Sequence, residues 1–362
     1  MKLLVLTTGM DGTAGGWGRY SSGLVSALRT HGVESSVVTS CENGGTHALL
    51  PGWGEYHANF FLAPFIAWRL RFLVKECDAI HAFVEPYAAI AWWLSRFSGK
   101  PYFVTAHGTY AVMPFHLSLH LQLVHRFVLQ SARAIIAVSD YTKGRLAQHG
   151  IHNVETIENG IDLAAFWNDM PLPFSSRDDL ILSVGALKRR KGQHVSLEAF
   201  VLITEKFPHL RYCMMGTGTD DAYLERLRTI VRTNGIEDRV EFLTEADQAG
   251  LLDRYRKAKV HILTPLSEGP HFEGFGLVYL EAGAAGIPSI GTRGTGAENA
   301  ITHEETGLLV PQNDAVATAE ALSRLLDNEQ EWTRMSAAAR ENALAHDWAV
   351  VAGSYARLYG RS

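Results

Sequence analysis

Two glutamates and a cluster of glycines in residues 264–292 have the residue types and the spacing that a phosphate or sugar site requires. Gly274 and Gly276 precede an apolar, helix-like segment, and a backbone without Cβ atoms can approach a ligand closely. The first N–H groups of such a helix have no partner within it and attract an anion. Glu273 lies before the predicted helix and Glu281 lies eight residues further on, so the two carboxylates can bind opposite ends of one ligand. The same spacing also fits a solvated helix residue beside a tight turn.

A second candidate group is basic. The segment SVGALKRRKG, residues 183–192, places Arg190 and Lys191 between a predicted strand and a predicted helix. Cations at this position can neutralise a diphosphate leaving group, and we select Lys191 for that role. A solvated basic turn is the alternative interpretation.

The first half of the chain contributes a glycine pair and a histidine. Gly15 and Gly16 follow a strand-like segment at residues 2–8, and His107 lies at the end of another at residues 102–108. Ligand sites of parallel α/β sheets lie at the carboxyl ends of the strands, which gives these residues a functional position. The glycines do not form Gly-x-Gly-x-x-Gly, so the dinucleotide fingerprint is absent. A structural role for His107 stays open.

The elements that must position these residues alternate between strands and helices, which predicts parallel, doubly wound sheets. Residues 166–179, FWNDMPLPFSSRDD, are rich in Pro, Ser and Asp and separate two such patterns. The strands predicted before this linker are residues 2–8, 33–40, 79–83, 102–108 and 134–139. The strands predicted after it are residues 180–187, 212–216, 239–243, 259–263, 288–291 and 307–310.

Bulk properties favour a two-domain protein that binds small molecules. A chain of 362 residues exceeds what one hydrophobic core usually serves, and a formal net charge of −5 argues against a nucleic-acid partner. The three cysteines are widely spaced, which indicates neither a disulfide framework nor a zinc site and fits the cytoplasm. The sequence has neither the pattern of a signal peptide nor an apolar run of membrane-spanning length. We expect a soluble or membrane-peripheral cytoplasmic protein.

The segment Glu-Gly-Phe-Gly-Leu, followed by Leu-Glu-Ala with seven residues between the glutamates, resembles the signature of the family 4 retaining glycosyltransferases. The family spacing selects Glu273 and leaves Glu268 without a role. The resemblance covers nearly the whole chain and implies the α/β GT-B fold, with two Rossmann-like, doubly wound parallel-sheet domains facing across a cleft. The N-terminal, acceptor-side domain is then residues 1–168 with a terminal helix at 346–362 that crosses back, and the nucleotide-sugar domain is residues 177–345.

The same resemblance implies the reaction and the roles of single residues. A sugar moves from a nucleoside diphosphate donor, with a UDP-sugar favoured, to a hydroxyl of a glycan or lipid-linked acceptor, with retention and without metal or cofactor. The missing Asp-x-Asp agrees with metal independence. Glu273 and His107 lie at the reacting sugar, and Ala186 stands where the family has an Arg. The implied donor-binding residues are Gly15, Gly16, Lys191, Arg190, Gly274, Phe275, Gly276, Leu277 and Glu281.

Two other functions remain open at this stage. A sugar-nucleotide epimerase or dehydrogenase could use a similar two-domain frame, and a binding protein could hold a nucleotide sugar without activity. The aromatic and basic segments at residues 59–74 and 90–97 also allow two interpretations. We expect them to pack in a core, and a peripheral membrane contact that serves a lipid-linked acceptor is the alternative.

Overall fold

The computed structural model describes residues 1–10, 15–40, 45, 47–52, 56–166, 171–218, 220–244 and 247–360. The chain divides into two compact units. The first unit combines Met1–Ile161 with His346–Ser362, and the second unit is Asp162–Ala345. The first unit is therefore built from two stretches that are distant in sequence.

A parallel sheet forms the centre of the first unit. Its described strands lie in the order β3-β2-β1-β4-β5-β6-β7, and every pairing is parallel. The sequence predicted all of them except β3 and β7, which are too short to form an apolar run. The strands are β1 (Lys2–Leu6), β2 (Glu34–Thr39), β3 (His47–Ala48), β4 (Ala79–Ala82), β5 (Tyr102–Ala106), β6 (Ala134–Ala137) and β7 (Val154–Thr156).

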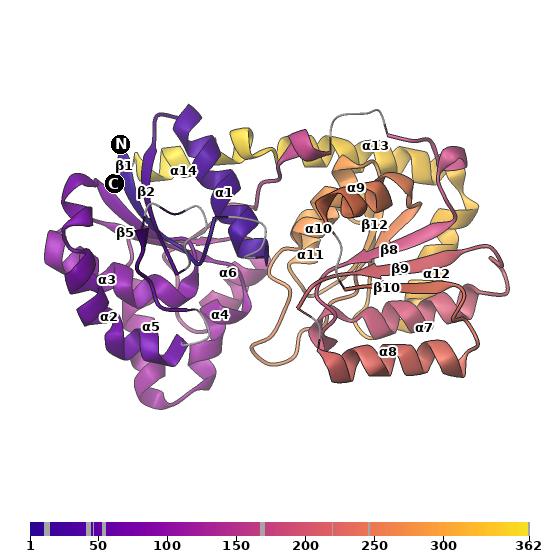
Figure 1. The fold of residues 1–362 in the computed structure, drawn as a ribbon, viewed down its shortest axis with the longest axis horizontal. Helices are drawn as coiled ribbons and strands as arrows, with labels where there is room; N and C mark the ends of the chain where they lie inside the picture. The colour runs from indigo at the N-terminus through magenta and orange to yellow at the C-terminus, as the bar shows by residue number, and fades with distance from the viewer. Residues whose placement is uncertain are drawn as a thin grey trace. The chain divides into compact units, whose positions relative to one another are not determined.

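Helices cover both faces of this sheet (Figure 1). One layer consists of α1 (Gly15–Thr30) and α14 (Trp348–Tyr359), which pack on each other and share a core with the strands. The opposite layer contains α2 (Tyr56–Leu70), α3 (Ala88–Ser98) and α5 (Leu119–Ser131). Two shorter helices are α4 (Thr109–Val112) and α6 (Asp140–Ala147). None of the helices in the described part of the chain is both long and apolar enough to span a bilayer.

A buried hydrogen-bond network attaches α14 to the sheet. The Tyr20 hydroxyl lies 2.9 Å from both the Thr105 and the Tyr355 hydroxyls. The His81 ring joins the Tyr359 hydroxyl at 2.7 Å and the Thr105 hydroxyl at 3.0 Å. Burial lowers the pKa of His81 to about 3, so the network is neutral at physiological pH. Satisfied polar groups of this kind fix the helix in one position on the sheet.

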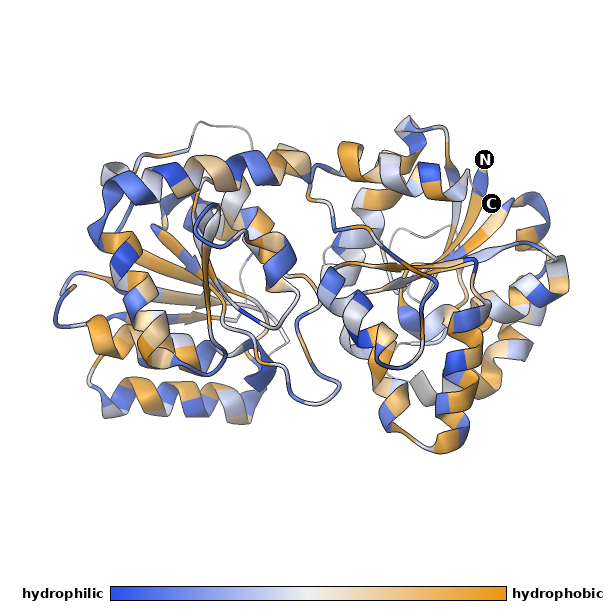
Figure 2. Ribbon diagram, turned by 180° about the vertical axis from the view of Figure 1, so that it is seen from behind, coloured by the Kyte–Doolittle hydropathy of each residue, from blue (hydrophilic) through white to orange (hydrophobic). Residues whose placement is uncertain are grey.

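The second unit contains another parallel sheet, in the order β10-β9-β8-β11-β12-β13. Each of these strands overlaps a segment predicted from the sequence, and Figure 2 shows the strands of both units as largely hydrophobic. The strands are β8 (Leu180–Val184), β9 (Arg211–Met215), β10 (Val240–Leu243), β11 (Val260–Ile262), β12 (Ser289–Thr292) and β13 (Gly307–Val310).

Two helical layers enclose this second sheet as well (Figure 1). One layer holds α7 (Gln193–Ile203), α8 (Asp221–Thr233) and α12 (Ala315–Asp327). The other holds α9 (Gln248–Lys257), α10 (Leu277–Ala284) and α13 (Glu329–Ala345), and α11 (Ala297–Ala300) follows β12. The sequence correctly predicted two doubly wound α/β sheets.

The structure corrects the prediction that the aromatic segment at residues 59–74 packs in a core. Phe61, Phe65 and Trp68 on α2 are 79%, 59% and 53% exposed. Apolar residues lie on all sides of α2, but the helix packs against α3, which covers only one of its faces. That covered face has the helical spacing of Ala63, Ile66, Ala67 and Leu70.

Candidate active site

The loops that carry the predicted donor residues follow two neighbouring strands of the second sheet. β8 and β11 are the two central strands of this sheet and pair with each other. The strands that follow β8 are added on one side of this pair, and the strands that follow β11 are added on the other side. Such a reversal of strand order leaves a crevice at the carboxyl ends, where α/β proteins bind ligands. Lys191 follows β8 and Glu273 follows β11.

Gly192 holds these two loops together. It has a φ of +69°, and a Cβ at this position would lie 1.7 Å from the carbonyl oxygen of Thr264. The Thr264 hydroxyl donates to the carbonyl of Gly192 at 2.8 Å, and the Leu266 N–H donates to the carbonyl of Arg190 at 2.8 Å. The conformation and the close contact both require glycine. This contact brings the basic turn at Arg189–Lys191 beside the loop after β11.

A compact charge cluster results from this arrangement. The Lys191 ammonium donates to Glu273 Oε2 at 2.5 Å, and Arg190 Nη1 lies 3.6 Å from the same oxygen. Burial by itself would raise the pKa of Glu273, but the two cations and the hydrogen bond more than offset it, so the pKa lies below its usual value. Glu273 is therefore ionised at neutral pH and holds two cations at the strand ends.

Glu268 and Arg189 form a separate, exposed pair at the edge of this cluster. Arg189 Nη2 and Nε donate to Glu268 Oε1 at 3.1 and 3.2 Å. The sequence left Glu268 without a role, and the structure pairs it with the one cation of the turn that does not face Glu273. Exposed pairs of this kind contribute little to stability.

Glu281 lies on the second turn of α10 and is 5% exposed. Its Oε2 accepts a hydrogen bond from the Tyr255 hydroxyl of α9 at 2.9 Å. α10 begins at Leu277, and Gly276 caps it with a φ of 87°. The predicted glycines thus lie at the N-terminus of this helix, with Gly274 and Phe275 immediately before the cap.

A third loop supports the segment before α10. Gly296, after β12, donates its N–H to the Glu273 carbonyl at 2.8 Å. A Cβ on Gly296 would lie 2.0 Å from the carbonyl oxygen of Gly274. The loop after β12 therefore holds the backbone of Glu273 and Gly274, and the basic turn after β8 holds the Glu273 side chain.

Gln193 is a residue that the sequence reasoning missed. It is fully buried at the start of α7, and its Nε2 donates to the Ala186 carbonyl at 3.1 Å. Its Oε1 is buried without a partner among the described residues. Gln193 therefore shapes the turn at Ala186, where the family pattern has an Arg. A polar residue between a basic turn and an apolar helix was the available signal.

His107 of the first unit lies at the carboxyl end of β5, half-buried among aromatic rings. Its Nε2 donates to the Phe83 carbonyl at 2.8 Å, so the neutral ring presents Nδ1 as an acceptor. Burial lowers the pKa of His107 to about 4, which keeps the ring uncharged at neutral pH. The Tyr20 and Trp17 ring centroids lie 4.5 and 6.3 Å from that of His107.

Glu85, which the sequence reasoning also missed, anchors the loop that carries His107. It follows β4, the neighbour of β5, and its Oε1 accepts from the N–H groups of His107 at 2.6 Å and Gly108 at 3.2 Å. Its Oε2 is buried without a partner among the described residues, and burial raises the pKa to about 7. A carboxylate directly after an apolar strand was the signal in the sequence.

The remaining predicted residues of the first unit lie at the start of α1. Gly15 and Gly16 begin this helix, and a Cβ on Gly16 would have no atom within 4 Å. The rest of the predicted glycine loop, residues 11–14, lies outside the described residues. Within the described part of the chain, no group of three or more His, Cys, Asp or Glu side chains could hold a metal ion.

Comparison with protein families matches both halves of the chain. Residues 14–165 match the family described as Glycosyltransferase Family 4, and residues 169–342 match Glycosyl transferases group 1. A phosphatidyl-myo-inositol mannosyltransferase of Mycobacterium leprae is 30% identical over 293 residues, which cover 80% of this chain and 75% of that protein. Glycogen synthase of Mycobacterium tuberculosis (strain ATCC 25618 / H37Rv) is 26% identical over 394 residues, which cover 95% and 91%.

Solved structures share the fold. Anabaena HepE in complex with UDP and glucose has a TM-score of 0.80, with 18% sequence identity and 100% of both chains covered. Sucrose-phosphate synthase from Thermosynechococcus elongatus has a TM-score of 0.79, with 22% identity and 100% of this chain and 98% of that chain covered.

Proposed function

Because this chain belongs to the family 4 glycosyltransferases, we propose that it moves a sugar from a nucleoside diphosphate donor to an acceptor hydroxyl, with retention of the anomeric configuration. The observation that carries the proposal is the charge cluster of Lys191, Arg190 and the buried Glu273 at the carboxyl ends of the two central strands of the second sheet. The two cations suit the diphosphate of a nucleotide sugar, and the carboxylate beside them suits the hydroxyl groups of the sugar. The HepE structures with UDP and with UDP-glucose support a UDP-sugar as the donor.

In this proposal the basic turn stabilises the leaving group. Negative charge develops on the diphosphate as its bond to the sugar breaks, and Lys191 and Arg190 offset that charge without reorganising. The N-terminus of α10 adds N–H groups that favour the same anion. Ala186 cannot supply the family's Arg, and Arg190 takes over that role.

Glu273 binds the donor sugar in this mechanism. A carboxylate held by two cations is a weak nucleophile, which disfavours a covalent sugar–Glu273 intermediate. We favour attack of the acceptor on the same face through an oxocarbenium-like state. His107, neutral and presenting Nδ1, accepts a hydrogen bond from a sugar hydroxyl and does not act as a general acid.

The acceptor in this proposal is a glycan or a lipid-linked saccharide. The similarity to a protein named phosphatidyl-myo-inositol mannosyltransferase supports a lipid-linked acceptor. A cytoplasmic location, at the inner face of the membrane for a lipid-linked acceptor, belongs to the same proposal.

Glutamine variants test the roles of the carboxylates. Glu281→Gln keeps the size of the side chain but loses charge-assisted bonds to ribose, so calorimetry with UDP should show affinity lower by about 1.5–3 kcal/mol. Glu273→Gln should keep UDP affinity and lose turnover, since its interaction strengthens as charge develops on the sugar. The matched control Glu268→Gln, in the exposed pair, should keep both.

Two outcomes would contradict this assignment. Loss of UDP affinity in Glu273→Gln together with unchanged affinity in Glu281→Gln would reverse the two roles. Conversion of a UDP-sugar into another UDP-sugar without any acceptor would indicate an epimerase.

Metal independence is a further part of the proposal. Since Lys191 and Arg190 neutralise the diphosphate, turnover should be unchanged in EDTA. Loss of activity in EDTA with recovery on adding Mg²⁺ or Mn²⁺ would overturn it.

A further inference from the structure

Large apolar side chains are exposed together on one layer of the first unit. Ten of the sixteen exposed large apolar side chains among the described residues lie between residues 61 and 127, on α2, α3, α5 and the turn after α2. We call this set the aromatic surface. Its aromatic members are Phe61, Phe65, Trp68, Phe72, Phe97 and Phe127.

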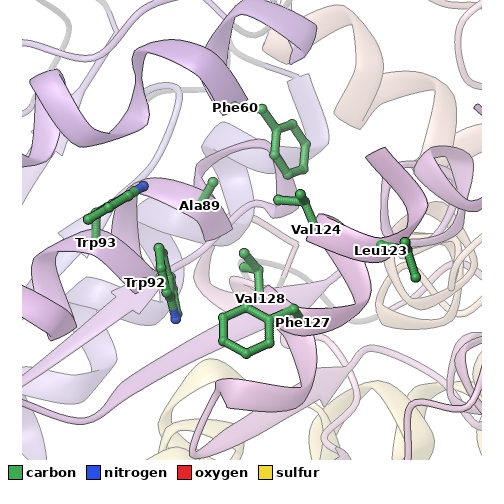
Figure 3. A pocket seen from close by; sticks show the side chains of 8 residues that line it. All are labelled: Phe60, Ala89, Trp92, Trp93, Leu123, Val124, Phe127 and Val128. Carbon is green, nitrogen blue, oxygen red and sulfur yellow. The ribbon is translucent and has the colours of Figure 1, made fainter. Parts of the chain in front are cut away.

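A pocket opens between the three helices of the aromatic surface (Figure 3). Its volume is about 400 Å³, within the range of ligand pockets, and all of its lining residues are aliphatic or aromatic. Phe60 enters it from α2, Trp92 and Trp93 from α3, and Phe127 from α5. The ring centroids of Trp92 and Phe127 lie 5.6 Å apart. The aromatic surface thus contains a pocket in addition to its exposed side chains.

The charged residues in the segments that form the aromatic surface have one sign. Residues 56–75 and 86–133 contain no Asp or Glu, although they include five arginines and two lysines. The Arg71 guanidinium lies 4.0 Å from the ring centroids of both Trp68 and Phe72. The next carboxylate in the sequence, Glu76, pairs with Lys2 at 3.0 Å. The aromatic surface is therefore apolar and cationic.

We propose that the aromatic surface docks the first unit on an anionic lipid bilayer, with the pocket accepting part of an acyl chain. Aromatic rings beside Arg and Lys are typical of helices that lie in a membrane interface. Each basic residue near an anionic leaflet adds to the attraction. A second copy of the chain fits this surface poorly, because a symmetric contact would bring the same cations together. The inference adds to the proposed function and does not depend on the donor or on the transfer reaction.

Vesicle flotation tests the proposal on the full chain. The protein should float with vesicles of phosphatidylcholine and phosphatidylglycerol in equal parts and far less with phosphatidylcholine alone. The double variant Phe61→Ser/Phe65→Ser should weaken binding by about tenfold or more, since both side chains insert. The matched control Leu202→Ser/Val316→Ser removes exposed apolar side chains of the second unit and should bind as the parent does.

Charge-reversal variants measure the electrostatic contribution to vesicle binding separately. Arg69→Glu/Arg96→Glu should weaken binding to the anionic vesicles by about tenfold or more. Arg29→Glu/Arg226→Glu makes the same change in net charge at two arginines that do not belong to the segments of the aromatic surface, and it should have a much smaller effect. Circular dichroism and UDP calorimetry on every variant show that the chain is folded and separate this test from the donor assignment.

Three results would overturn the inference. The first is flotation that is equal for the two vesicle compositions, and the second is flotation that survives both the serine and the glutamate variants. The third is a dimer, detected by light scattering without lipid, that the Phe61→Ser/Phe65→Ser variant dissociates while no flotation occurs. That last result would assign the aromatic surface to contact between copies.

Discussion

At the scale of residues, two buried glutamates have pKa values that are shifted in opposite directions. Glu273 faces Lys191 and Arg190, which stabilise its charge, whereas Glu85 accepts hydrogen bonds from backbone N–H groups and has a pKa raised to about 7. Burial raises the pKa of both side chains, but at Glu273 the two cations and the hydrogen bond outweigh it. The carboxylate beside the donor loops is thus anionic, and the one beside His107 gains or loses a proton near neutral pH.

Glu85 predicts a specific pH dependence of stability. Its folded pKa lies above its ordinary value of 4.5, so protonated Glu85 stabilises the fold fully in acid, and this contribution is lost as the pH rises through about 7. Chemical denaturation of the parent and Glu85→Gln should show that the parent loses up to about 3 kcal/mol relative to the variant between about pH 4 and pH 8.

The parent must be compared with Glu85→Gln because buried histidines change the pH dependence of stability in the opposite direction. The lowered pKa values of His81, His107 and His261 remove stability as the pH falls, and this effect is shared by the parent and the variant. Parallel stability curves across the pH range would contradict the raised pKa of Glu85.

The sequence selected candidate residues but not their partners. Residue type and spacing selected Lys191 and Glu273 as separate candidates, whereas the contact between them depends on β8 and β11 being neighbours. Glu85 and Gln193 were missed because an oxygen without a partner exists only after the chain has packed around it. Local patterns carry no information about such burial.

At the scale of elements, Gly192 joins two loops that each follow a different strand. We expect Gly192→Ala to lower the free energy of unfolding by more than about 2 kcal/mol, because the new Cβ would meet the Thr264 carbonyl. Gly235 is the matched control: its φ is +61°, and a Cβ there has no atom within 4 Å. Gly235→Ala should cost only the left-handed backbone conformation, about 1 kcal/mol.

Urea denaturation of the two alanine variants measures the difference. Donor turnover should fall in Gly192→Ala and stay unchanged in Gly235→Ala, since only Gly192 positions the basic turn. Equal stability losses in the two variants would show that the close contact with Thr264 adds nothing.

The elements themselves were predictable to different degrees. Alternating apolar runs identified the longer strands, and the family resemblance to a GT-B glycosyltransferase is confirmed by the family matches and the solved structures. β3 and β7 were missed because HA and VET contain too few apolar residues. α2 was assigned to a core because hydrophobicity does not reveal how many faces of a helix its neighbours cover.

At the scale of the whole molecule, each unit has its own core and a central tryptophan. Trp348 of the first unit fills space against Gly23 and Gly160, where an added Cβ would lie 2.0 and 2.4 Å from the indole. Trp332 of the second unit is 2% exposed and donates to the Lys259 carbonyl at 2.6 Å. Each unit thus has a tryptophan that packs in its own hydrophobic core.

The matched pair Trp348→Ala and Trp332→Ala tests whether the units unfold independently. Each variant should lose about 3–5 kcal/mol, but only in its own unit. Hydrogen exchange followed by mass spectrometry should show faster exchange in residues 1–161 for Trp348→Ala and in residues 171–345 for Trp332→Ala. Faster exchange throughout the chain in either variant would indicate a single cooperative unit.

The attachment of α14 to the first sheet sets an order of events on the ribosome. Residues 162–345 form a continuous stretch that is synthesised between the first sheet and α14. The first sheet emerges earlier, but Tyr355 and Tyr359 are synthesised more than 180 residues after its last strand. Until then Tyr20 and His81 lack their hydrogen-bond partners from α14. The unit whose residues appear first is thus finished last, and a nascent chain exposes an incomplete core for as long as the second unit takes to be made.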